Sequence, residues 1–427
     1  MEKVLGATKK LIPGPLWIII QPIYHYFLAF LGAIIYGFPS SKLIAIGVTG
    51  TKGKSTTVEL INAIFEESGA KTALSNTIRF KIGTESTPNM YKMSMPGRFF
   101  MQKFLREAAN AGCTYAIIEM TSEGAKLFRH KFIALNALVV TNIAPEHIEA
   151  HGSYEKYLAA KVSIALNLAH SSKERRILVV NDDDGEAPNF LRIKNVEKIT
   201  YSLKDALPYQ TAAFKNEFDW NGVHFISPLG GLFNLYNILG ALTCAKAFGV
   251  SYEVMEQAIA KFKNVPGRLE KIEAGQDFEI YVDYAHTAES LEALYKTFPN
   301  QRKICVFGST GGGRDKWKRP KMGEVADRYC EEIILTDDDS YDEDPSSIME
   351  EIATGIKNKK LETIVDRRMA IKKALERAYT LRQAQGNKDV VVLITGKGTD
   401  PYLMGPNGKK TPWSDAKIVK EGITKLN

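Results

Sequence analysis

Short apolar runs alternate with helical patterns along most of this chain. Between residues 43 and 265, the runs that predict strands are Leu43–Val48, Tyr115–Glu119, Ala137–Thr141 and Ile177–Asn181. Patterns that predict helices include Thr56–Ser68, Arg98–Ala111 and Asn234–Phe248, while Lys198–Ser227 predicts a small β region. Strands separated by helices in this way are typical of a mainly parallel sheet covered by helices.

A second set of alternating elements follows the sequence Val265-Pro266-Gly267-Arg268, which predicts a domain boundary. The strands expected there are Ile280–Asp283, Lys303–Phe307, Glu332–Thr336 and Val390–Thr395. The helices expected between them are Ala288–Phe298, Lys321–Tyr329, Ser346–Thr354 and Arg368–Thr380. The pattern therefore predicts an α/β protein, with a central domain over 43–265 and a Rossmann-like domain over 266–427.

Residues 1–42 form a separate N-terminal segment, predicted to be helical. From Leu16 to Tyr36 this segment is almost wholly apolar and aromatic, and Pro22 interrupts it. Its length would just cross a bilayer, but the lysines before it would then lie outside the cell, against the usual bias. An interfacial or protein-packed helix and a membrane span both stay open, with the interfacial helix favoured.

Composition is that of a globular protein, with 44% apolar and 25% charged residues and a net charge of +7 among 427 residues. Because basic and acidic residues alternate, the charge indicates a solvated surface and no nucleic-acid stripe. The four cysteines Cys113, Cys244, Cys305 and Cys330 form no closely spaced pair. We expect buried free thiols in a reducing compartment, with no disulfide and no zinc site.

The run from Gly47 to Thr56 carries the strongest chemical signal. Its glycines lie between a predicted strand and a predicted helix, where backbone N–H groups and the positive helix end favour phosphate. Lys54 would reach the β- and γ-phosphates of ATP, and Ser55 would hold Mg²⁺. The alternative is a simple glycine-rich turn before a helix.

Polar clusters also follow two other predicted strands, where α/β enzymes place their active sites. Glu119 ends one strand and could bind Mg²⁺, which prefers oxygen ligands, or could be a solvated carboxylate. After the next strand, the segment 141–152 contains His147, His151 and two glutamates. Histidine and carboxylate side chains in one segment indicate a metal site or structural histidines, and no cysteine joins them to suggest structural zinc.

The order of these motifs resembles that of the Mur ligase family, in its MurE-like branch (UDP-N-acetylmuramoyl-tripeptide synthetases). The matching stretches are TGTKGKST, EMTSEG, TNIAPEHIEAHGSYEKYLAAK, GLFNLYN, PGRLE, VDYAHT, GGGRDKWKRPKMGE, TDDDSYDEDP and ITGKGTD. The resemblance implies an ATP-dependent amide ligase. Such an enzyme activates a muramoyl-peptide carboxylate as an acyl phosphate and joins an amino acid to it, in peptidoglycan precursor synthesis.

The resemblance also implies roles for individual residues. Lys54, His151 and Lys161 would be catalytic, and Lys161 falls on the lysine that is carbamylated in this family. Mg²⁺ would be held by Ser55, Glu119, His151 and Lys161. ATP would be bound by Gly50, Thr51, Gly53, Lys54, Ser55, Thr56, Asn234, Asn237, Arg268, Asp283 and His286. The muramoyl peptide and the amino acid would contact Thr87, Arg314, Asp338, Tyr341, Gly396 and Asp400.

The chain departs from the family pattern in three places. Only about forty residues precede the first strand, too few for the usual UDP-binding domain, so we expect an acceptor held without the usual uridine contacts. Tyr341 replaces an arginine that would bind a second carboxylate, and four aspartates nearby (Asp337, Asp338, Asp339, Asp342) favour a cationic amino acid such as lysine or ornithine. Asp400 stands where the family has a glutamate.

Two other classes of function stay open. A polyglutamate-type or folylpolyglutamate-synthase-like ligase would also begin near the phosphate loop, and a membrane-associated scaffold could retain an ATP site without ligase activity. For the leading hypothesis we expect a cytoplasmic monomer that uses ATP and Mg²⁺ and binds no nucleic acid. Residues 16–36 would make peripheral contact with the inner face of the membrane.

Overall fold

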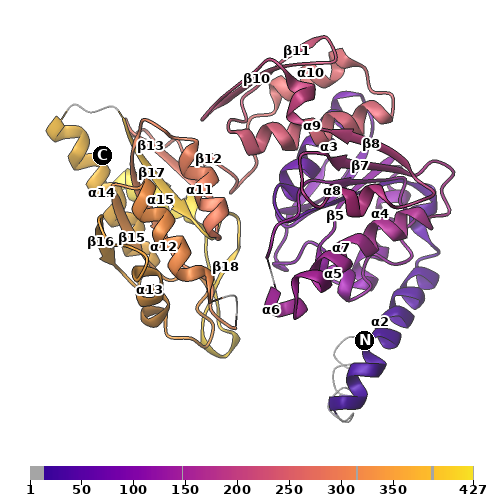
Figure 1. Cartoon of the computed structure of the whole chain (residues 1–427), viewed down its shortest axis with the longest axis horizontal. Coiled ribbons are helices and arrows are strands. Elements are labelled where there is room, and N and C mark those ends of the chain that lie inside the picture. Colours follow the sequence, from indigo (N-terminus) through magenta and orange to yellow (C-terminus); the bar gives the residue numbers. More distant parts are fainter. Residues whose placement is uncertain (1–13, 147, 314–315, 386–388, 427) are drawn as a thin grey trace. The chain divides into compact units, whose positions relative to one another are not determined.

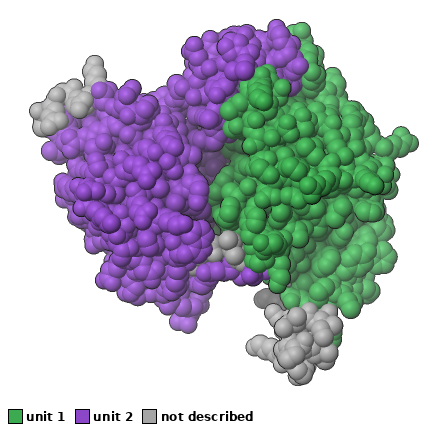
Figure 2. Space-filling model, in the orientation of Figure 1, with its two compact units in different colours: residues 1–146, 153–205, 236–257 green, residues 147–152, 206–235, 258–427 purple. Residues whose placement is uncertain are grey.

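The computed structural model describes residues 14–146, 148–313, 316–385 and 389–426 (Figure 1). The chain divides into two compact units. Unit 1 comprises residues 1–146, 153–205 and 236–257, and unit 2 comprises residues 147–152, 206–235 and 258–427 (Figure 2). Each unit is built around a sheet of its own, so each is described separately.

Unit 1 contains an eight-stranded sheet with the order β4-β3-β2-β5-β1-β6-β7-β8. The strands are β1 (Ile44–Thr49), β2 (Thr72–Ser75), β3 (Arg79–Ile82), β4 (Glu85–Pro88), β5 (Tyr115–Glu119), β6 (Ala137–Val140), β7 (Ile177–Asn181) and β8 (Glu197–Tyr201). All neighbouring strands from β2 to β8 are parallel, whereas β3 and β4 pair antiparallel at one edge. The predicted parallel sheet is therefore confirmed, and the antiparallel edge was not predicted.

Helices cover both faces of this sheet. Helix α3 (Lys54–Glu67) packs on β1, β2 and β5. The other face forms one apolar core with α4 (Arg98–Asn110), α5 (Ser122–Lys126), α7 (Tyr154–Ala169) and α8 (Ala187–Leu191). Because β1 is buried on both faces, its C-terminal end and the loop after it are fixed by packing from two sides.

Unit 2 contains a six-stranded sheet with the order β12-β13-β17-β14-β15-β16. The strands are β12 (Glu270–Lys271), β13 (Glu279–Asp283), β14 (Arg302–Phe307), β15 (Glu332–Leu335), β16 (Lys360–Thr363) and β17 (Val390–Thr395). They are parallel except for the β12–β13 pair. This arrangement confirms the predicted second α/β sheet.

Two apolar cores flank the sheet of unit 2. One is formed with α11 (Ala288–Lys296), α12 (Lys318–Tyr329) and α13 (Pro345–Ala353), and the other with α14 (Arg367–Gln385) and α15 (Asp415–Leu426). Unit 2 also contains a three-stranded sheet, β9 (Tyr209–Ala212), β10 (Lys215–Trp220) and β11 (Val223–Ser227), and a β18–β19 hairpin (Tyr402–Met404, Lys410–Pro412). The boundary between the units falls within α9 (Leu232–Ala247) and α10 (Tyr252–Lys261).

The cysteines only partly follow the prediction. Cys113 and Cys244 are buried free thiols, as expected. Cys305 on β14 and Cys330 after α12 form a disulfide, with their Cα atoms 6.2 Å apart, so the prediction of four free thiols is wrong for this pair. The two residues are 25 positions apart in sequence, and only the packing of α12 on the sheet brings them together.

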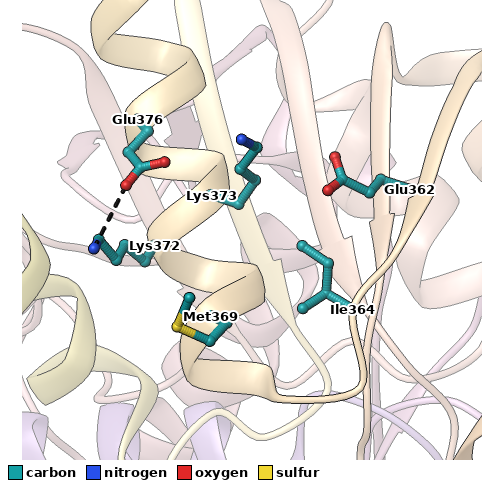
Figure 3. Close-up of a pocket in the computed structure, with 6 residues that line it drawn as sticks. All are labelled: Glu362, Ile364, Met369, Lys372, Lys373 and Glu376. Carbon is teal, nitrogen blue, oxygen red and sulfur yellow. Dashed lines mark ion pairs between the residues drawn. The ribbon is translucent and has the colours of Figure 1, made fainter.

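Helix α14 also lines a pocket of about 260 Å³ in unit 2 (Figure 3). Its lining residues are Glu362, Ile364, Met369, Lys372, Lys373 and Glu376. Lys372 forms an ion pair with Glu376 along the helix, with 3.7 Å between Nζ and Oε1. None of the predicted site residues lines this pocket.

The apolar N-terminal stretch forms helix α2 (Gly14–Ile35), which contains Pro22. The helix packs on α4 and on the turn around Phe132, in unit 1. Arg106 of α4 donates hydrogen bonds to the carbonyl oxygens of Tyr36 and Gly37 just beyond the helix end. No helix among the described residues combines the length and the apolar character that crossing a membrane requires.

Candidate active site

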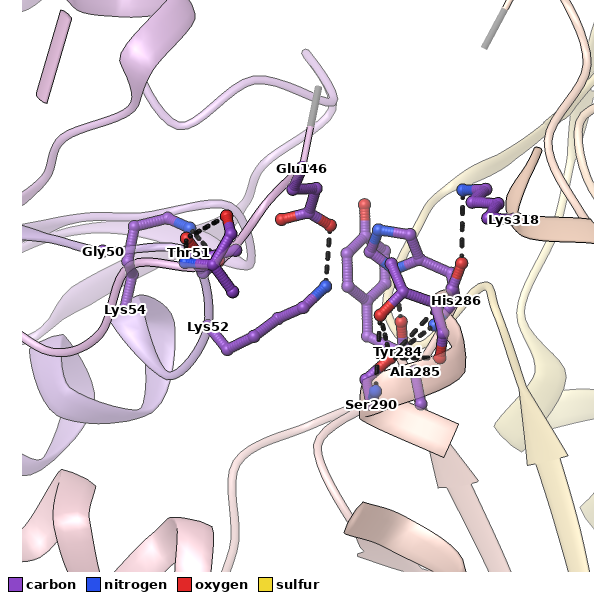
Figure 4. Close-up of polar contacts among 12 residues, drawn as sticks. Gly50, Thr51, Lys52, Lys54, Glu146, Tyr284, Ala285, His286, Ser290 and Lys318 are labelled. Carbon is purple, nitrogen blue, oxygen red and sulfur yellow. Dashed lines mark hydrogen bonds and ion pairs between the residues drawn. The ribbon is translucent and has the colours of Figure 1, made fainter. Parts of the chain in front are cut away.

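The predicted phosphate loop lies between β1 and α3 in unit 1 (Figure 4). Gly53 is the N-cap of α3 with φ of +80°, and a Cβ there would lie 2.0 Å from Asn237 Oδ1. A Cβ on Gly50 would lie 1.9 Å from Thr141 Oγ1, so both positions need glycine. Helix α3 has no side-chain cap, which leaves the N–H groups of its first turn suited to an anion.

Asn142 holds the shape of this loop. Its backbone oxygen accepts from Thr51 N at 2.7 Å, and its side-chain oxygen accepts from Lys52 N at 2.8 Å. Lys54 Nζ donates to the Thr51 carbonyl oxygen at 2.9 Å (Figure 4). Lys52 forms an ion pair with Glu146 at 2.7 Å. Asn142 and Glu146 follow β6 in the motif TNIAPEH, within the segment 141–152 that the sequence indicated as a metal site or a set of structural histidines.

Glu119 is buried at the C-terminal end of β5, and four hydrogen bonds from three residues surround its carboxylate. Ser55 Oγ donates to it at 2.7 Å, Ser94 Oγ at 2.8 Å, and Thr77 from Oγ1 at 2.9 Å and from N at 3.1 Å. Burial alone would raise the pKa of Glu119, but the charge of Lys54 and these hydrogen bonds lower it below its ordinary value. The carboxylate is therefore held ionised.

Thr77 and Ser94 are site residues that the sequence did not indicate. Thr77 lies between β2 and β3, and Ser94 precedes α4. Their hydroxyl groups are 2.6 Å apart and both face Glu119. No motif marks either residue, and the pairing of β2 with β5 brings Thr77, two residues after β2, to this carboxylate.

Lys161 is also buried, on the inner side of α7. Its Nζ donates to the Gly50 carbonyl oxygen at 2.7 Å and lies 4.9 Å from the centre of the Tyr157 ring. Burial, followed by the positive charge of Lys54, lowers the pKa of Lys161 well below its ordinary value. Tyr157 in turn shares a 2.6 Å hydrogen bond with Thr51 Oγ1, so the YxxxK spacing ties α7 to the phosphate loop twice.

Unit 1 thus brings together Lys54, Ser55, Glu119 and Lys161 around one loop. Thr56 is buried in the first turn of α3, and Asn237 accepts a 3.4 Å hydrogen bond from Thr57. Thr87 is exposed on the edge strand β4.

The remaining predicted nucleotide ligands belong to unit 2. Asp283 ends β13, and its carboxylate accepts from Leu269 N at 2.6 Å and from Ala285 N at 2.7 Å. The Arg268 guanidinium lies 4.1 Å from the centre of the Tyr284 ring. His286 shares a 2.7 Å hydrogen bond with the Tyr284 carbonyl oxygen, just before α11 (Figure 4). The DYAHT sequence therefore folds into one hydrogen-bonded turn.

Two other predicted residues also fall in unit 2. His151 is buried in the short helix α6 (Ile148–His151). Asn234 is buried and donates to the Gly230 carbonyl oxygen at 2.8 Å. Arg314 lies outside the described residues.

The acidic loop after β15 is packed against the loop after β17, within unit 2. Lys397 is buried, and its Nζ lies 2.7 Å from Asp339 Oδ1, 3.5 Å from Asp400 Oδ2 and 3.9 Å from Asp338 Oδ1. A Cβ on Gly396 would lie 2.1 Å from Asp338 Oδ2. Lys397 therefore balances part of the negative charge of these aspartates, which weakens the expectation that the acidic loop favours a cationic amino acid.

The buried environment of Asp338 disfavours the ionised form of its carboxyl group. Burial raises the pKa of its carboxyl to about 6 despite the nearby charges of Lys397 and Arg367. Tyr341 is half-buried with φ of +52°, and a Cβ on Gly312 would lie 2.9 Å from its ring. Arg367 forms a buried ion pair with Asp415 at 2.7 Å and donates to the Thr395 carbonyl oxygen, which supports the strand end that carries Gly396.

The described residues contain no group of three or more histidine, cysteine, aspartate or glutamate side chains arranged to hold a metal ion. The donor set around Glu119 is instead one carboxylate and hydroxyl oxygens. Such a set suits Mg²⁺, which commonly takes one or two carboxylates and completes its shell with water and substrate phosphates. The residues present therefore fit magnesium bound together with a nucleotide.

Comparison with known proteins matches both units to one family. Residues 48–245 match the Mur ligase middle domain, and residues 267–398 match the Mur ligase, glutamate ligase domain. The UDP-N-acetylmuramyl-tripeptide synthetase of Roseiflexus sp. (strain RS-1) is 36% identical over 456 residues, covering 99% of this chain and 88% of that protein. The UDP-N-acetylmuramoyl-L-alanyl-D-glutamate--2,6-diaminopimelate ligase of Syntrophomonas wolfei is 33% identical, covering 98% of this chain and 86% of that protein.

A solved structure of a UDP-N-acetylmuramoyl-L-alanyl-D-glutamate--2,6-diaminopimelate ligase is 28% identical, with a TM-score of 0.60. The similarity covers 90% of this chain and 79% of that one. The chain therefore belongs to the Mur ligase family, whose members are ATP-dependent acid–amino-acid ligases, and it is MurE-like.

Proposed function

We propose that this chain joins an amino acid to the free carboxylate of a muramoyl peptide in peptidoglycan precursor synthesis, with ATP as the energy source. The names of its relatives support this substrate class. The observation that carries the proposal is the grouping of Lys54, Ser55, Glu119 and Lys161 around one phosphate loop. A binding protein would have no need of this combination.

The reaction takes place in two steps. An oxygen of the acceptor carboxylate attacks the γ-phosphorus of ATP, which forms an acyl phosphate and releases ADP. The amino group then attacks the carbonyl carbon, and phosphate and one proton leave as the amide forms. Lys54 and the first-turn N–H groups of α3 stabilise the negative charge on the transferred phosphoryl group.

Mg²⁺ would be held by Ser55 Oγ and the Glu119 carboxylate, with His151 and a carbamylated Lys161 as further ligands. When bound, it supplies positive charge that neutralises the phosphoryl oxygens. Thr77 and Ser94 orient Glu119, because their hydroxyl groups occupy one of its two oxygens. The other oxygen, which Ser55 shares, then faces the phosphate loop.

The burial of Lys161 supports carbamylation. Burial lowers the pKa of Lys161, which favours the neutral amine, and the neutral amine is the form that attacks carbon dioxide. A nitrogen–carbon bond forms, one proton leaves, and a negative carboxylate replaces a positive ammonium. The adjacent charges of Lys52 and Lys54, which disfavour an ammonium here, favour that carboxylate.

The nucleotide and the second substrate would use the other predicted residues. Gly50, Thr51, Gly53 and Thr56 would contact phosphates, and Asn234, Asn237, Arg268, Asp283 and His286 the rest of the nucleotide. Thr87, Arg314, Asp338, Gly396 and Asp400 would contact the peptide or the amino acid. The carboxylates of Asp338, Asp339 and Asp400 face Lys397, so selection of a cationic amino acid would rest mainly on Tyr341, which cannot bind a second carboxylate as an arginine does.

We also propose that the enzyme is a cytoplasmic monomer that contacts the inner face of the membrane through residues 16–36. The proposed use of ATP supports a cytoplasmic site for the chemistry. The membrane contact rests on α2 and is independent of the ligase activity.

Phosphate release from ATP and Mg²⁺ tests the function. The acceptor is UDP-MurNAc-L-Ala-D-Glu, the amino acids are lysine, ornithine, diaminopimelate and glutamate, and the product mass is recorded. Release that needs the acceptor and one amino acid, with the matching mass gain, would support the proposal. Release only with a folate or γ-glutamyl acceptor and glutamate would replace it with a polyglutamate-type ligase, and release independent of any acceptor would favour a scaffold.

A further inference from the structure

Glu59 is a buried carboxylate that the site described above does not include, although it lies on the helix that begins with Lys54 and Ser55. Its side chain is 6% exposed. A spacing of four residues places Glu59 one turn after Ser55 on α3. A carboxylate is buried in a protein only where hydrogen bonds or an ion pair compensate its loss of water, so the partners of Glu59 indicate what this residue holds in place.

Two side chains from the start of the antiparallel edge bind the Glu59 carboxylate. Asn76 Nδ2 donates to Glu59 Oε1 at 2.9 Å. Arg79 donates to both oxygens, from Nε to Oε1 at 2.9 Å and from Nη2 to Oε2 at 2.6 Å. Two parallel hydrogen bonds from one guanidinium fix the direction of a carboxylate as well as its distance. Glu59 therefore connects α3 to the turn between β2 and β3.

This turn, residues 76–79, is closed by the Asn76 side chain. Its amide oxygen accepts from Arg79 N at 2.8 Å, and Asn76 N donates to the Arg79 carbonyl oxygen at 3.1 Å. Thr77 lies inside the turn and donates to Glu119 from both N and Oγ1. Because the amide of Asn76 uses its oxygen for the turn and its NH₂ group for the carboxylate on α3, one side chain sets both the shape of the turn and its distance from the helix.

A second asparagine joins the same turn to the segment that carries Ser94. Asn89 is buried, and its Nδ2 donates to the carbonyl oxygens of Asn76 and Met93 at 2.7 and 3.0 Å. Ser94 follows directly and donates to Glu119 at 2.8 Å. Both hydroxyl groups that orient the Glu119 carboxylate are therefore connected to the turn that Glu59 holds.

We propose that Glu59 is a positioning residue for the magnesium site, and that it acts on Glu119 through the turn 76–79. The hydrogen bonds form a closed path, which leaves α3 at Glu59, crosses the turn to Glu119 and returns to α3 at Ser55. Both ends of the path lie on one helix, so the direction of the Glu119 carboxylate is set relative to the phosphate loop directly before that helix. The inference rests on the magnesium site of the proposed function and is independent of which amino acid the enzyme joins.

Isothermal titration of the full chain with AMP-PNP, a non-hydrolysable ATP analogue, tests this role with and without Mg²⁺. We expect the wild type to bind AMP-PNP more tightly when Mg²⁺ is present. Glu59→Gln removes the negative charge that Arg79 binds, and Asn76→Asp replaces the N–H donor to Glu59 with a second carboxylate oxygen. Each variant should lose at least about tenfold in affinity with Mg²⁺ and bind like the wild type without it. Thermal unfolding checks that both variants are folded.

Glu66→Gln is the matched control. Glu66 also lies on α3 and also forms an ion pair with a cation of β3, but that cation, Lys81, lies outside the turn 76–79. The control is expected to bind like the wild type under both conditions. Wild-type affinity with Mg²⁺ in Glu59→Gln, an equal loss in Glu66→Gln, or a loss that is the same with and without Mg²⁺ would overturn the positioning role.

The same titration separates this inference from the proposed function. A wild type whose AMP-PNP affinity does not change with Mg²⁺ would remove the magnesium site, and the role of Glu59 with it. Magnesium dependence that Glu59→Gln abolishes, in a protein that joins no amino acid to any acceptor, would support the role of Glu59 and overturn only the proposed reaction.

Discussion

Ser55 Oγ donates a 2.7 Å hydrogen bond to Glu119 Oε2, although the two residues are 64 positions apart. Ser55 lies in the first turn of α3, directly after the phosphate loop, and Glu119 ends β5. Strand β5 pairs in parallel with β1, and Val48 is opposite Glu119 in the register. The hydrogen bond therefore connects the phosphate loop to the carboxylate at the same edge of the sheet, where α/β enzymes bind their ligands.

Replacing Glu119 with glutamine should remove most of the activity. The amide keeps the shape, but it loses the negative charge and directs an NH₂ group at donors such as Ser55 and Thr77. We expect kcat/KM to fall at least about 100-fold, with a weaker dependence on Mg²⁺ and a loss of about 1–3 kcal/mol in the free energy of unfolding. Glu123→Gln, at an exposed position of α5, is the control. Unchanged magnesium dependence in Glu119→Gln would remove Glu119 from the metal site.

Replacing Lys161 with methionine tests the carbamate. Methionine fills a similar volume but cannot react with carbon dioxide, so we expect activity to fall at least about 100-fold. In the wild type, ¹³C-labelled bicarbonate should give a carbamate signal in ¹³C NMR spectra that Lys161→Met lacks. Lys156→Met, on the exposed side of the same helix, should keep both activity and signal. A fully active Lys161→Met enzyme would contradict the assigned role.

Two adjacent arginines of α14 offer a matched test of burial. Arg367 is fully buried against Asp415, so Arg367→Met leaves an uncompensated charge and should cost about 3–5 kcal/mol of unfolding free energy. Arg368 forms an exposed pair with Glu421, and Arg368→Met should cost less than about 1 kcal/mol. Chemical denaturation measures both. Equal effects would mean that the buried pair contributes no more than the surface pair.

The raised pKa of Asp338 predicts that this residue makes the free energy of unfolding depend on pH. Its pKa in the folded state is about 6 against 3.8 for the ordinary group, so the folded chain binds this proton more tightly than the unfolded chain does. Ionisation therefore lowers stability as the pH rises from 3.8 to about 6, and the cost stays above that range.

Asp338→Asn should consequently be more stable than the wild type by about 1–3 kcal/mol at neutral pH, with a gain that shrinks toward zero in acid. Thermal unfolding across this range measures the difference. Asp342→Asn, at an exposed carboxylate of the same loop, serves as the control. A gain that is constant with pH would show that Asp338 is not the titrating group.

Tyr341→Arg should change the choice of amino acid. A guanidinium can bind a second carboxylate through two hydrogen bonds, which a phenol cannot do. We expect the wild type to prefer lysine or ornithine, and Tyr341→Arg to raise the kcat/KM for diaminopimelate relative to lysine at least about tenfold. The amino-acid panel with mass detection measures this, with Tyr379→Arg on α14 as the control. A wild-type preference for diaminopimelate would refute the role given to Tyr341.

The strongly periodic parts of the fold were predictable from sequence. The predicted strand Tyr115–Glu119 matches β5, and the predicted strand Val390–Thr395 matches β17, because buried parallel strands read as continuous apolar runs. The antiparallel strands β3 and β4 were missed. Strand β4, with the sequence Glu-Ser-Thr-Pro, is exposed throughout and leaves no apolar pattern.

The candidate site, like the fold, contains some features that the sequence predicted and others that it did not. Glycine spacing and the lysine and serine beside it indicated the phosphate loop, since that chemistry is local to one turn. Thr77 and Ser94, which orient Glu119, carry no local signal, because their role depends on which strands are neighbours. The acidic loop indicated a preference for a cationic amino acid, but Lys397 lies against it from the loop after β17, more than fifty residues later.

The sequence by itself determined the family, the two α/β sheets and the phosphate loop, because these follow from local spacing and apolar periodicity. Tertiary structure alone decided three further features: the hydrogen bonds around Glu119, the Cys305–Cys330 disulfide and the apolar face that α2 leaves exposed. Each depends on contacts between segments distant in the chain. The order of strands in a sheet and the packing of helices on it set those contacts. The pattern of residues along the chain specifies neither strand order nor helix packing at the level of single residues.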